Sequence, residues 1–459
     1  VIRLMDDSLV AGEGSDGGLA TCSVDVSLSQ IQLEEKDEES DDEERELRNL
    51  AEYDYQIFVL SQYGRPIFVS SGQEDKLCAL FALIGVFVSR VKAWNDTLES
   101  FSAGNVHVHF AHRPPLILAV VSKRPDWLAA QLDVIYDQIV STLSKTQLDT
   151  VYDKKGDNYD LRRLLRGTDK SMMNCVSTWR SDPALYLSAI RVFPLSGSER
   201  EALSTQICTA ITSAKTQGIL FAIVISHRQL VCLVRFKKYI IHQNDVHIIM
   251  NVVANNQSLR NGETWTPICL PKFNNSGFLH AHISYPWDGL EACMILLSTK
   301  REDFFALSAI KADITSRVTS NASLLSSLTK AFTKPATFDC SPIGRCNEHL
   351  WYFVYKNRNS QQLCLCGSRP PFISREERRA LNRSISSAAF VARSHSGLKM
   401  AFVRRKHDAL NIRWGDKLEL ICVMSPLVTV AAANFITDQL LRLLKNSEHR
   451  YFITHTPSF

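Results

Sequence analysis

The segment "DNYDLRRLLRGTD" (157–169), which continues into Lys170 and Ser171, is the first candidate for chemistry because it gathers arginines beside a glycine and a threonine. Its end, "GTDKS" (167–171), has the composition of a phosphate-binding loop. Such a loop requires a glycine directly before the lysine and a strand that leads into a glycine-rich turn. Here Asp169 precedes Lys170, and its carboxylate would repel a phosphate. The segment is therefore not predicted to bind a nucleotide.

The same segment predicts a short helix with two different sides. Asp160 is placed to cap this helix and Gly167 can end it. Helical spacing gives an apolar stripe and a basic stripe: Leu161, Leu164 and Leu165 on the first, and Arg162, Arg163 and Arg166 on the second. The basic stripe is either a solvated face or a docking face for acidic residues, including the chain's own acidic run at 34–46.

Cysteines and histidines are the other candidate ligands. "CSPIGRC" (340–346) and "CLC" (364–366) contain possible zinc ligands. Zinc sites usually use closely spaced cysteine pairs, whereas "CLC" has the alternation of an apolar strand and favours packed thiols. The histidines lie in predicted strands without an HExxH pattern, a nucleophile elbow or paired acids: His107, His109, His112, His280 and His282. No metal, no cofactor and no self-contained enzyme active site is predicted.

The composition is that of a globular protein with about three domains, since 45% of the 459 residues are apolar and 22% are charged. The longest apolar run, "LCALFALIGVFV" (77–88), is shorter than the ~20 residues that a membrane span needs. The first residues lack the features of a secretory signal, and the cysteines are spread through apolar runs. These features favour a cytosolic protein with reduced thiols.

The charge is divided unevenly along the chain. The net charge is +4, but residues 1–54 contain 17 acidic and 4 basic residues, a balance of −13 that leaves +17 for residues 55–459. Residues 1–52, which include "EEKDEESDDEERE" (34–46), cannot bury enough apolar surface to offset the entropy of ordering. We therefore predict a disordered acidic tail in front of a basic body.

One order of elements occurs three times after Tyr53. Each copy has a strand hairpin, a helix, three strands and a second helix, the order ββαβββα. The hairpins are "QIFVLSQ" with "PIFVSSG", "ILFAIVISH" with "QLVCLVRFKK", and "LWYFVYK" with "QQLCLCG". We predict an α/β protein of the α+β type, with three five-stranded antiparallel sheets and flanking helices. The predicted boundaries are a tail at 1–52, repeats at 53–156, 197–317 and 337–459, a helical linker at 157–196 and a second linker at 318–336.

The helix predicted at 73–94 is apolar on two sides. One stripe can cover the sheet: Leu77, Leu80, Phe81, Ile84, Val88 and Val91. The other side carries Ala79, Ala82, Leu83, Val86 and Ala93, with Arg90 as its only charge. A helix that is apolar all round needs burial on both sides. Either another segment of the chain, such as the helices at 160–190, covers the second side, or another protein docks there.

Two surface features complete the candidates. Arg404, Arg405 and Lys406 form a basic run before a tight turn, which is either a solvated edge or a site for anionic lipid on a basic body. Trp265 follows a polar loop at the start of a strand, where a tryptophan is either half-buried core or an aromatic anchor for a partner.

Two runs, "NYDLRRLL" (158–165) and "FNNSGFLHAHISY" (273–285), are specific enough to suggest a family. Together with "EDKLCALFALIGVFVSRV", "PPLILAVVSK", "QLDVIYDQIVSTLS" and "REDFFALSAIK", they resemble the SAND, or Mon-one, family of vacuolar and endosomal fusion proteins. The resemblance covers almost all of residues 53–459. It implies three longin domains, in agreement with the repeats, and a cytoplasmic protein recruited to endosome, late-endosome and lysosome or vacuole membranes.

The resemblance also implies partners. Family members pair with a second three-longin protein of the Ccz type, and the pair is a guanine nucleotide exchange factor for the late-endosomal or vacuolar Rab GTPase. The implied partner and Rab surface lies on the first longin domain, at Ala79, Ala82, Leu83, Val86 and Arg90. An early-endosomal Rab is expected to recruit the protein at Trp265, and phosphoinositide-containing membranes are expected at Arg404, Arg405 and Lys406. No nucleic-acid partner is expected, and a third regulatory subunit is left open.

An exchange factor makes no covalent bond. It binds the nucleotide-free GTPase preferentially and needs no acid, base or nucleophile of its own, so that this chain without its partner is expected to be weak or inactive. Two alternatives remain. One is a longin scaffold or tether that binds Rabs and membranes without exchange, and the other is a three-longin exchange factor of the Hermansky-Pudlak or Fuzzy kind, against which the two specific runs argue.

Overall fold

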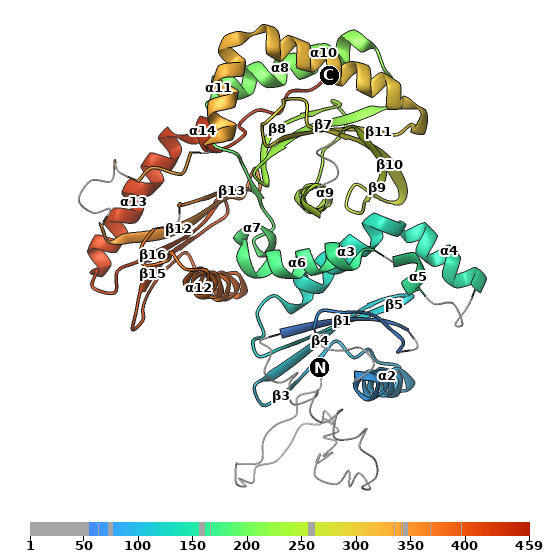
Figure 1. The fold of residues 1–459 in the computed structure, drawn as a ribbon. Coiled ribbons are helices and arrows are strands. Elements are labelled where there is room, and N and C mark those ends of the chain that lie inside the picture. Colours follow the sequence, from blue (N-terminus) through green and yellow to red (C-terminus); the bar gives the residue numbers. More distant parts are fainter. Residues whose placement is uncertain are drawn as a thin grey trace. The chain divides into compact units, whose positions relative to one another are not determined.

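A computed structural model of the chain describes residues 55–62, 64–71, 77–155, 161–165, 167–255, 262–334, 336–340, 342, 348–367, 369–395 and 397–459 (Figure 1). The tail predicted to be disordered, 1–52, lies outside these residues. The chain divides into two compact units, the first ending at Leu132 and the second running from Asp133 to Phe459. Each unit is described by itself.

The first unit contains a five-stranded antiparallel sheet in the order β2-β1-β5-β4-β3. Its strands are β1 (Tyr55–Ser61), β2 (Pro66–Val69), β3 (Ser100–Ala103), β4 (Val106–Arg113) and β5 (Leu116–Ser122). Helix α2 (Cys78–Ala93) packs one side on this sheet, where the rings of Phe81 and Phe58 meet edge to face at 5.6 Å. The predicted order ββαβββ is therefore present, and helix α3 (Leu128–Leu143) begins in this unit and continues into the second.

Short helices connect the first sheet to the second. They are α4 (Lys145–Lys155), α5 (Arg162–Leu165), α6 (Asp169–Ser181) and α7 (Pro183–Tyr186), followed by strand β6 (Ile190–Arg191). Helix α7 begins at a proline, and the Asp182 carboxylate caps it by accepting the backbone N–H of Ala184 at 3.0 Å. The predicted helical linker at 157–196 thus contains α5, α6 and α7.

The second repeat has a five-stranded antiparallel sheet in the order β8-β7-β11-β10-β9. Its strands are β7 (Ile219–Ser226), β8 (Gln229–Arg235), β9 (Thr264–Leu270), β10 (Asn274–Ser284) and β11 (Ala292–Ser298). Helices α8 (Gly197–Ala214), α10 (Phe304–Ser320, after the 3-10 turn η5, Arg301–Asp303) and α11 (Ala322–Thr333) cover one face, and α9 (Gln243–Asn255) covers the other (Figure 1). Strands buried on both faces explain the nearly unbroken apolar runs of β7 and β11.

Helix α11 lies inside the segment that we predicted as the second linker, 318–336. Serines and threonines fill its outer side, but Leu324, Leu328 and Phe332 recur every four residues and are buried in the core under α8 and α10. The Asn321 side chain starts the helix by accepting the N–H of Leu324 at 3.1 Å. Most of this segment therefore belongs to the second repeat.

The third repeat has a six-stranded sheet in the order β14-β15-β16-β12-β13-β6, one strand more than predicted. Its own strands are β12 (Leu350–Asn357), β13 (Gln362–Leu365), β14 (Met400–Arg404), β15 (Ala409–Trp414) and β16 (Leu418–Met424). The sixth is β6, which pairs parallel to β13 and, at two residues, is too short for alternation to reveal it. Helices α12 (Arg375–Ser394) and α13 (Val430–Asn446) lie on opposite faces, and α14 (Glu448–Tyr451) follows (Figure 1).

The fold class is thus the predicted α+β arrangement of three mostly antiparallel sheets with flanking helices. Among the residues that the structure describes, no helix is long and apolar enough to cross a membrane.

Arg200 joins the second repeat to the end of the third. Its side chain, on α8, is buried and donates five hydrogen bonds to backbone carbonyl oxygens. The acceptors are Phe193 (2.8 Å), Val231 (3.0 Å), His449 (2.9 Å), Arg450 (3.1 Å) and Phe452 (3.1 Å). Burial lowers the pKa of Arg200 to about 10, which leaves the guanidinium charged at neutral pH. Oriented carbonyl dipoles therefore stabilise this buried charge.

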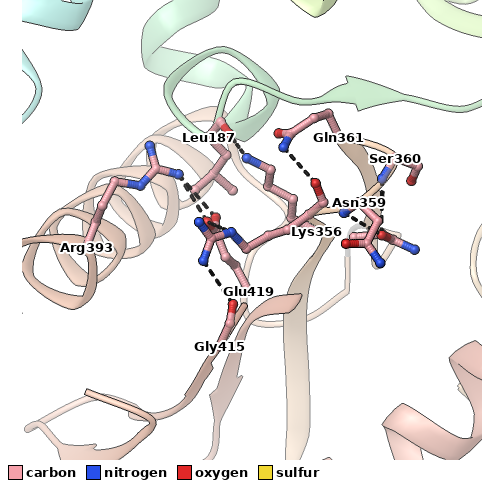
Figure 2. A network of polar contacts seen from close by, with 10 residues as sticks. Leu187, Lys356, Asn359, Ser360, Gln361, Arg393, Gly415 and Glu419 are labelled. Carbon is pink, nitrogen blue, oxygen red and sulfur yellow. Dashed lines mark hydrogen bonds and ion pairs between the residues drawn. The ribbon is translucent and has the colours of Figure 1, made fainter. Parts of the chain in front are cut away.

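A second contact ties the linker to the third repeat (Figure 2). The Nζ of Lys356, buried on β12, donates to the carbonyl oxygen of Leu187 at 2.6 Å. Beside it, the buried carboxylate of Glu419 on β16 pairs with Arg393 at 3.2 Å and with Arg358 at 3.5 Å. Burial lowers the pKa of Lys356 to about 8, although Glu419 favours the charged lysine.

We expect Arg200→Met to lower the free energy of unfolding by about 3 kcal/mol or more, because five carbonyl groups would lose the guanidinium at once and three of these hydrogen bonds are buried. Denaturant titration of the full chain measures this change. Arg317→Met is the matched control, because Arg317 on α10 is partly exposed and pairs with Asp313 one turn away. Equal effects of the two substitutions would show that Arg200 does not join the repeats.

Lys356 should make stability depend on pH in the alkaline range. Between about pH 8 and its ordinary pKa of 10.5, the folded protein has released this proton while the unfolded chain still binds it, so the free energy of unfolding rises with pH. At about 1.4 kcal/mol per pKa unit, the rise approaches about 3 kcal/mol. The difference in the free energy of unfolding between the wild type and Lys356→Met, measured at several pH values, should show this rise. A constant difference would contradict the assignment.

Candidate functional site

Helix α2 presents an exposed apolar side, which we call the α2 outer face. It consists of Ala82, Leu83, Val86, Phe87, Arg90 and Trp94. The exposed fractions are 44% for Leu83, 61% for Val86, 44% for Phe87 and 56% for Trp94. The opposite stripe is covered as predicted, with Leu77, Phe81, Ile84 and Val91 buried and Leu80 and Val88 partly buried in the sheet core. The side chain of the predicted site residue Ala79 lies outside the described residues.

Two aromatic residues of this face were missed by the sequence analysis. Phe87 and Trp94 each lie four residues after a predicted member, Leu83 and Arg90, so that helical spacing could have found them. The Arg90 guanidinium lies over the Trp94 ring, 5.7 Å from its centroid. Phe87 contacts Phe101 edge to face at 6.2 Å. The face therefore combines small, aliphatic and aromatic side chains around one cation.

One of the two occupants that the sequence left open for this face was the chain's own helices at 160–190. In the second unit, α6 packs against α9 and α12, and α7 packs against α12. Leu83 and Val86 are exposed in the structure. Docking of another protein on the α2 outer face stays a prediction.

Trp265 lies at the start of β9, the edge strand of the second sheet, and is half-buried. Its ring stacks on His280 at 5.5 Å and meets Phe304 edge to face at 6.0 Å. Phe304 in turn touches Phe305, whose side chain is 81% exposed. This aromatic edge, composed of Trp265, His280, Phe304 and Phe305, thus has a half-buried base and an exposed tip. The role of Trp265 in recruitment stays a prediction.

An ion-pair network lies under the aromatic edge. Glu263 accepts from the ring Nε2 of buried His282 at 2.9 Å and pairs with Lys311 at 3.0 Å. Partial burial opposes ionisation of Glu263, but hydrogen bonds from Ser308, His282 and Lys311 lower its pKa to about 2. The network positions the start of β9, and with it Trp265.

The predicted basic patch is partly engaged within the chain. The Arg405 guanidinium binds the Asp408 carboxylate at 2.6 Å and also contacts Ser384. Arg404 donates to the carbonyl oxygen of Val428 at 2.6 Å but is exposed, as is Lys406. Because the charge of Arg405 is paired with that of Asp408, Arg404 and Lys406 are the residues of this patch that can attract an anion. Membrane binding here stays a prediction.

The predicted basic stripe at 162–166 lies on α5. Leu161 and Leu165 are buried, and Arg162 and Arg163 are exposed, whereas Arg166 and the predicted cap Asp160 lie outside the described residues. Gly167 ends the helix with a φ of 94°, which only glycine adopts readily. Lys170 is in the first turn of α6. The local structure is thus the predicted short helix, and the docking role of its basic face stays a prediction.

The described cysteines singled out in the sequence lie together in the third repeat, the histidines lie in strands of the first and second repeats, and Cys346 lies outside the described residues. Cys340, Cys364 and Cys366 are buried free thiols in the core of the third repeat. His107 pairs with the Ser102 hydroxyl at 2.8 Å, and His112 with the carbonyl oxygen of Leu98 at 2.8 Å. Within the described ranges, no group of three or more His, Cys, Asp or Glu side chains could hold a metal ion.

Three protein-family models match the chain, one for each repeat. They are described as the first, second and third longin domains of FUZ, MON1 and HPS1, and they match residues 55–175, 217–316 and 349–448 respectively. Each matched range contains the five antiparallel strands of one repeat, and β6, the sixth strand of the third sheet, lies outside the third range.

Curated relatives match most of the chain. "Vacuolar fusion protein MON1 homolog A" of Gallus gallus is 34% identical over 404 residues, which cover 86% of this chain and 71% of that protein. "Protein SAND" of Takifugu rubripes is 35% identical over 402 residues, covering 86% and 75%. "Vacuolar fusion protein MON1" of Yarrowia lipolytica is 30% identical over 412 residues, covering 87% and 74%.

These matches confirm the resemblance found in the sequence, including the three longin domains. The chain belongs to the MON1/SAND family of vacuolar fusion proteins.

Proposed function

We propose that this chain acts in vacuolar or endosomal fusion as one subunit of a heterodimeric guanine nucleotide exchange factor. The other subunit is a Ccz-type three-longin protein, and the substrate is the late-endosomal or vacuolar Rab GTPase. The α2 outer face is the observation that carries this proposal. Leu83, Val86, Phe87 and Trp94 expose apolar side chains on the first longin domain, in a chain whose relatives are named vacuolar fusion proteins.

The physical argument rests on how exchange works. An exchange factor accelerates nucleotide release by binding the GTPase more tightly without nucleotide than with it, and this difference comes from a contact surface rather than from reacting groups. An exposed mixed aliphatic and aromatic surface around Arg90 suits such a contact, because aromatic residues and arginines are enriched among interface hot spots. The chain is not proposed to be an enzyme by itself, and no cofactor is proposed for it.

Recruitment needs other surfaces. We assign attraction of an early-endosomal Rab to the aromatic edge at Trp265, and attraction of phosphoinositide-containing membranes to Arg404 and Lys406 on a chain portion of charge +17. The protein would then be cytoplasmic and bind peripherally to endosome, late-endosome and lysosome or vacuole membranes. A third regulatory subunit fits this scheme but has no surface assigned to it.

The second candidate function is a longin scaffold that binds Rabs and membrane without accelerating exchange. The exposed α2 outer face favours it equally, because a tether also needs a partner surface. Release of fluorescent GDP from the late-endosomal Rab separates the two functions. It is measured with this chain, with the Ccz-type partner, and with both. Acceleration only by the pair supports the exchange factor, whereas a flat trace for the pair would leave the scaffold.

Val86→Asp should reduce exchange by the pair about tenfold or more. A carboxylate at this exposed position would have to be desolvated on docking, which costs more than the about 1.4 kcal/mol that corresponds to a factor of ten. Ile373→Asp is the matched control, since Ile373 is a β-branched residue of similar exposure, 64% against 61%. Pull-down of the partner and GDP release are measured for both variants. Equal losses would reject the α2 outer face.

Trp265→Ala should weaken binding to membranes that carry the early-endosomal Rab about tenfold, while exchange in solution stays unchanged. The substitution removes a ring that stacks on His280 and meets Phe304 edge to face, and Trp265→Phe, which keeps most of this packing, should retain more binding. Liposome flotation and solution GDP release are compared. Loss of both activities together would indicate a folding defect and reject the assignment.

A further inference from the structure

Strand β14 is an edge strand of the third sheet. It pairs with β15 on one side, and among the residues that the structure describes no strand pairs with its other side. Two other sheet edges are covered by the chain itself. Residues 457–459 bond to Arg235 at the edge of β8, and β6 lies along β13. An uncovered edge with free peptide groups is a template for another strand.

The hydrogen bonds of the β14–β15 hairpin show which peptide groups point outward. Arg405 N–H donates to the carbonyl oxygen of Asp408 at 2.8 Å, and Trp414 N–H donates to that of Lys399 at 2.9 Å. Bonded and non-bonded pairs alternate along antiparallel strands. The odd-numbered residues of β14 therefore bond to β15, and Met400, Phe402 and Arg404 turn their N–H and C=O groups to the open edge.

The corresponding edge of the second repeat is less suited to strand addition. Strand β9 contains Pro267, an exposed residue without an N–H, and its register with β10 shifts between Asn274 and Leu279. Proline and irregular register are common protections of an edge. The five residues of β14, "MAFVR", contain no proline and pair with β15 in unbroken register.

Exposed apolar side chains flank the β14 edge on both faces of the sheet. On the α13 face it is Met400 (53% exposed), and on the α12 face they are Val403 (43%) and Val391 (51%). Val391 lies two turns after Ser384, which contacts Arg405. A strand added to β14 would place its side chains alternately beside Met400 on one face and beside Val403 and Val391 on the other.

The charge around the β14 edge has one sign. Residues 399–406 include Lys399, Arg404, Arg405 and Lys406 and no acidic residue, and only Arg405 is paired, with Asp408. Basic groups lie at both ends of this apolar strand. They favour a partner segment whose central residues alternate between apolar and polar and whose ends carry acidic residues. A lipid surface could neutralise the charges, but it offers no ladder of donors and acceptors to the outward peptide groups. The outward N–H and C=O groups of β14 therefore favour a peptide as the docked partner.

We propose that the β14 edge, defined by Met400, Phe402, Arg404, Val403 and Val391, docks an extended segment of a partner protein as a seventh strand of the third sheet. The docked segment alternates apolar and polar residues and carries acidic residues at both ends. This surface is separate from the α2 outer face and does not depend on the exchange activity proposed above.

The test uses a fluorescent synthetic peptide of alternating valine and threonine with glutamates at both ends, titrated against the full chain by anisotropy. Phe402→Ala and Phe402→Pro both remove the ring, but only the proline removes the outward N–H. We expect Phe402→Pro to bind about tenfold more weakly than Phe402→Ala, since one hydrogen bond contributes about 1 to 1.5 kcal/mol. A peptide with lysines in place of the glutamates should not bind.

Melting curves check that both variants fold, and Arg404→Ala with Arg404→Pro repeat the comparison at a second outward N–H if Phe402→Pro is unstable. Equal binding by the alanine and proline variants would overturn strand addition, as would no binding to the wild type. Phosphatidylserine vesicles that bind the wild type while the peptide does not would assign the surface to lipid alone. Self-association that is lost only in Phe402→Pro would identify a second copy of the chain as the occupant of the edge. Peptide binding that appears only when residues 1–52 are removed would identify the chain's own tail as the occupant.

Discussion

The buried guanidinium of Arg200 is the contact on which the arrangement of the second and third longin domains depends. A charge removed from water is costly unless its donors are all used, and Arg200 uses its own on five carbonyl oxygens from three separate parts of the chain. One acceptor is on β8, one is Phe193 before α8, and three lie around α14. Because carbonyl dipoles must point at one centre, the guanidinium fixes the directions of all three segments.

Short segments near Arg200 also connect the second and third repeats. β6 extends the third sheet, and the next residue, Val192, bridges to Leu230 on β8, so that three consecutive residues link two sheets. Lys356 holds the carbonyl oxygen of Leu187 just before β6, and Gln362 exchanges hydrogen bonds with the backbone of Ile453. Most of these bonds end on backbone atoms. They therefore fix the path of the chain more directly than contacts between flexible side chains would.

The periodic elements of this fold could be predicted from the sequence, and the contacts between them could not. "ILFAIVISH" was predicted as a strand of a hairpin and is β7 (Ile219–Ser226), because a short apolar run rich in β-branched residues defines it locally. Helix α11 was missed because serine and threonine hide a stripe of only three buried residues. Arg200 gives no signal at all, since its acceptors near the end of the chain lie about 250 residues away. For the α2 outer face the stripe could be predicted, but its exposure depends on tertiary structure.

The pattern of covered and uncovered edges bears on how a chain without a proposed catalytic centre can act. The chain covers the edges of β8 and β13 with its own residues where two longin domains meet, whereas in the described part of the chain β14 pairs on one side only and α2 exposes apolar side chains. Exposed apolar side chains lower solubility and would be disfavoured unless another molecule covers them for part of the time. Partner binding then supplies the free energy that nucleotide exchange requires, because a surface can accelerate release only to the extent that it binds one state of the GTPase more tightly than the other.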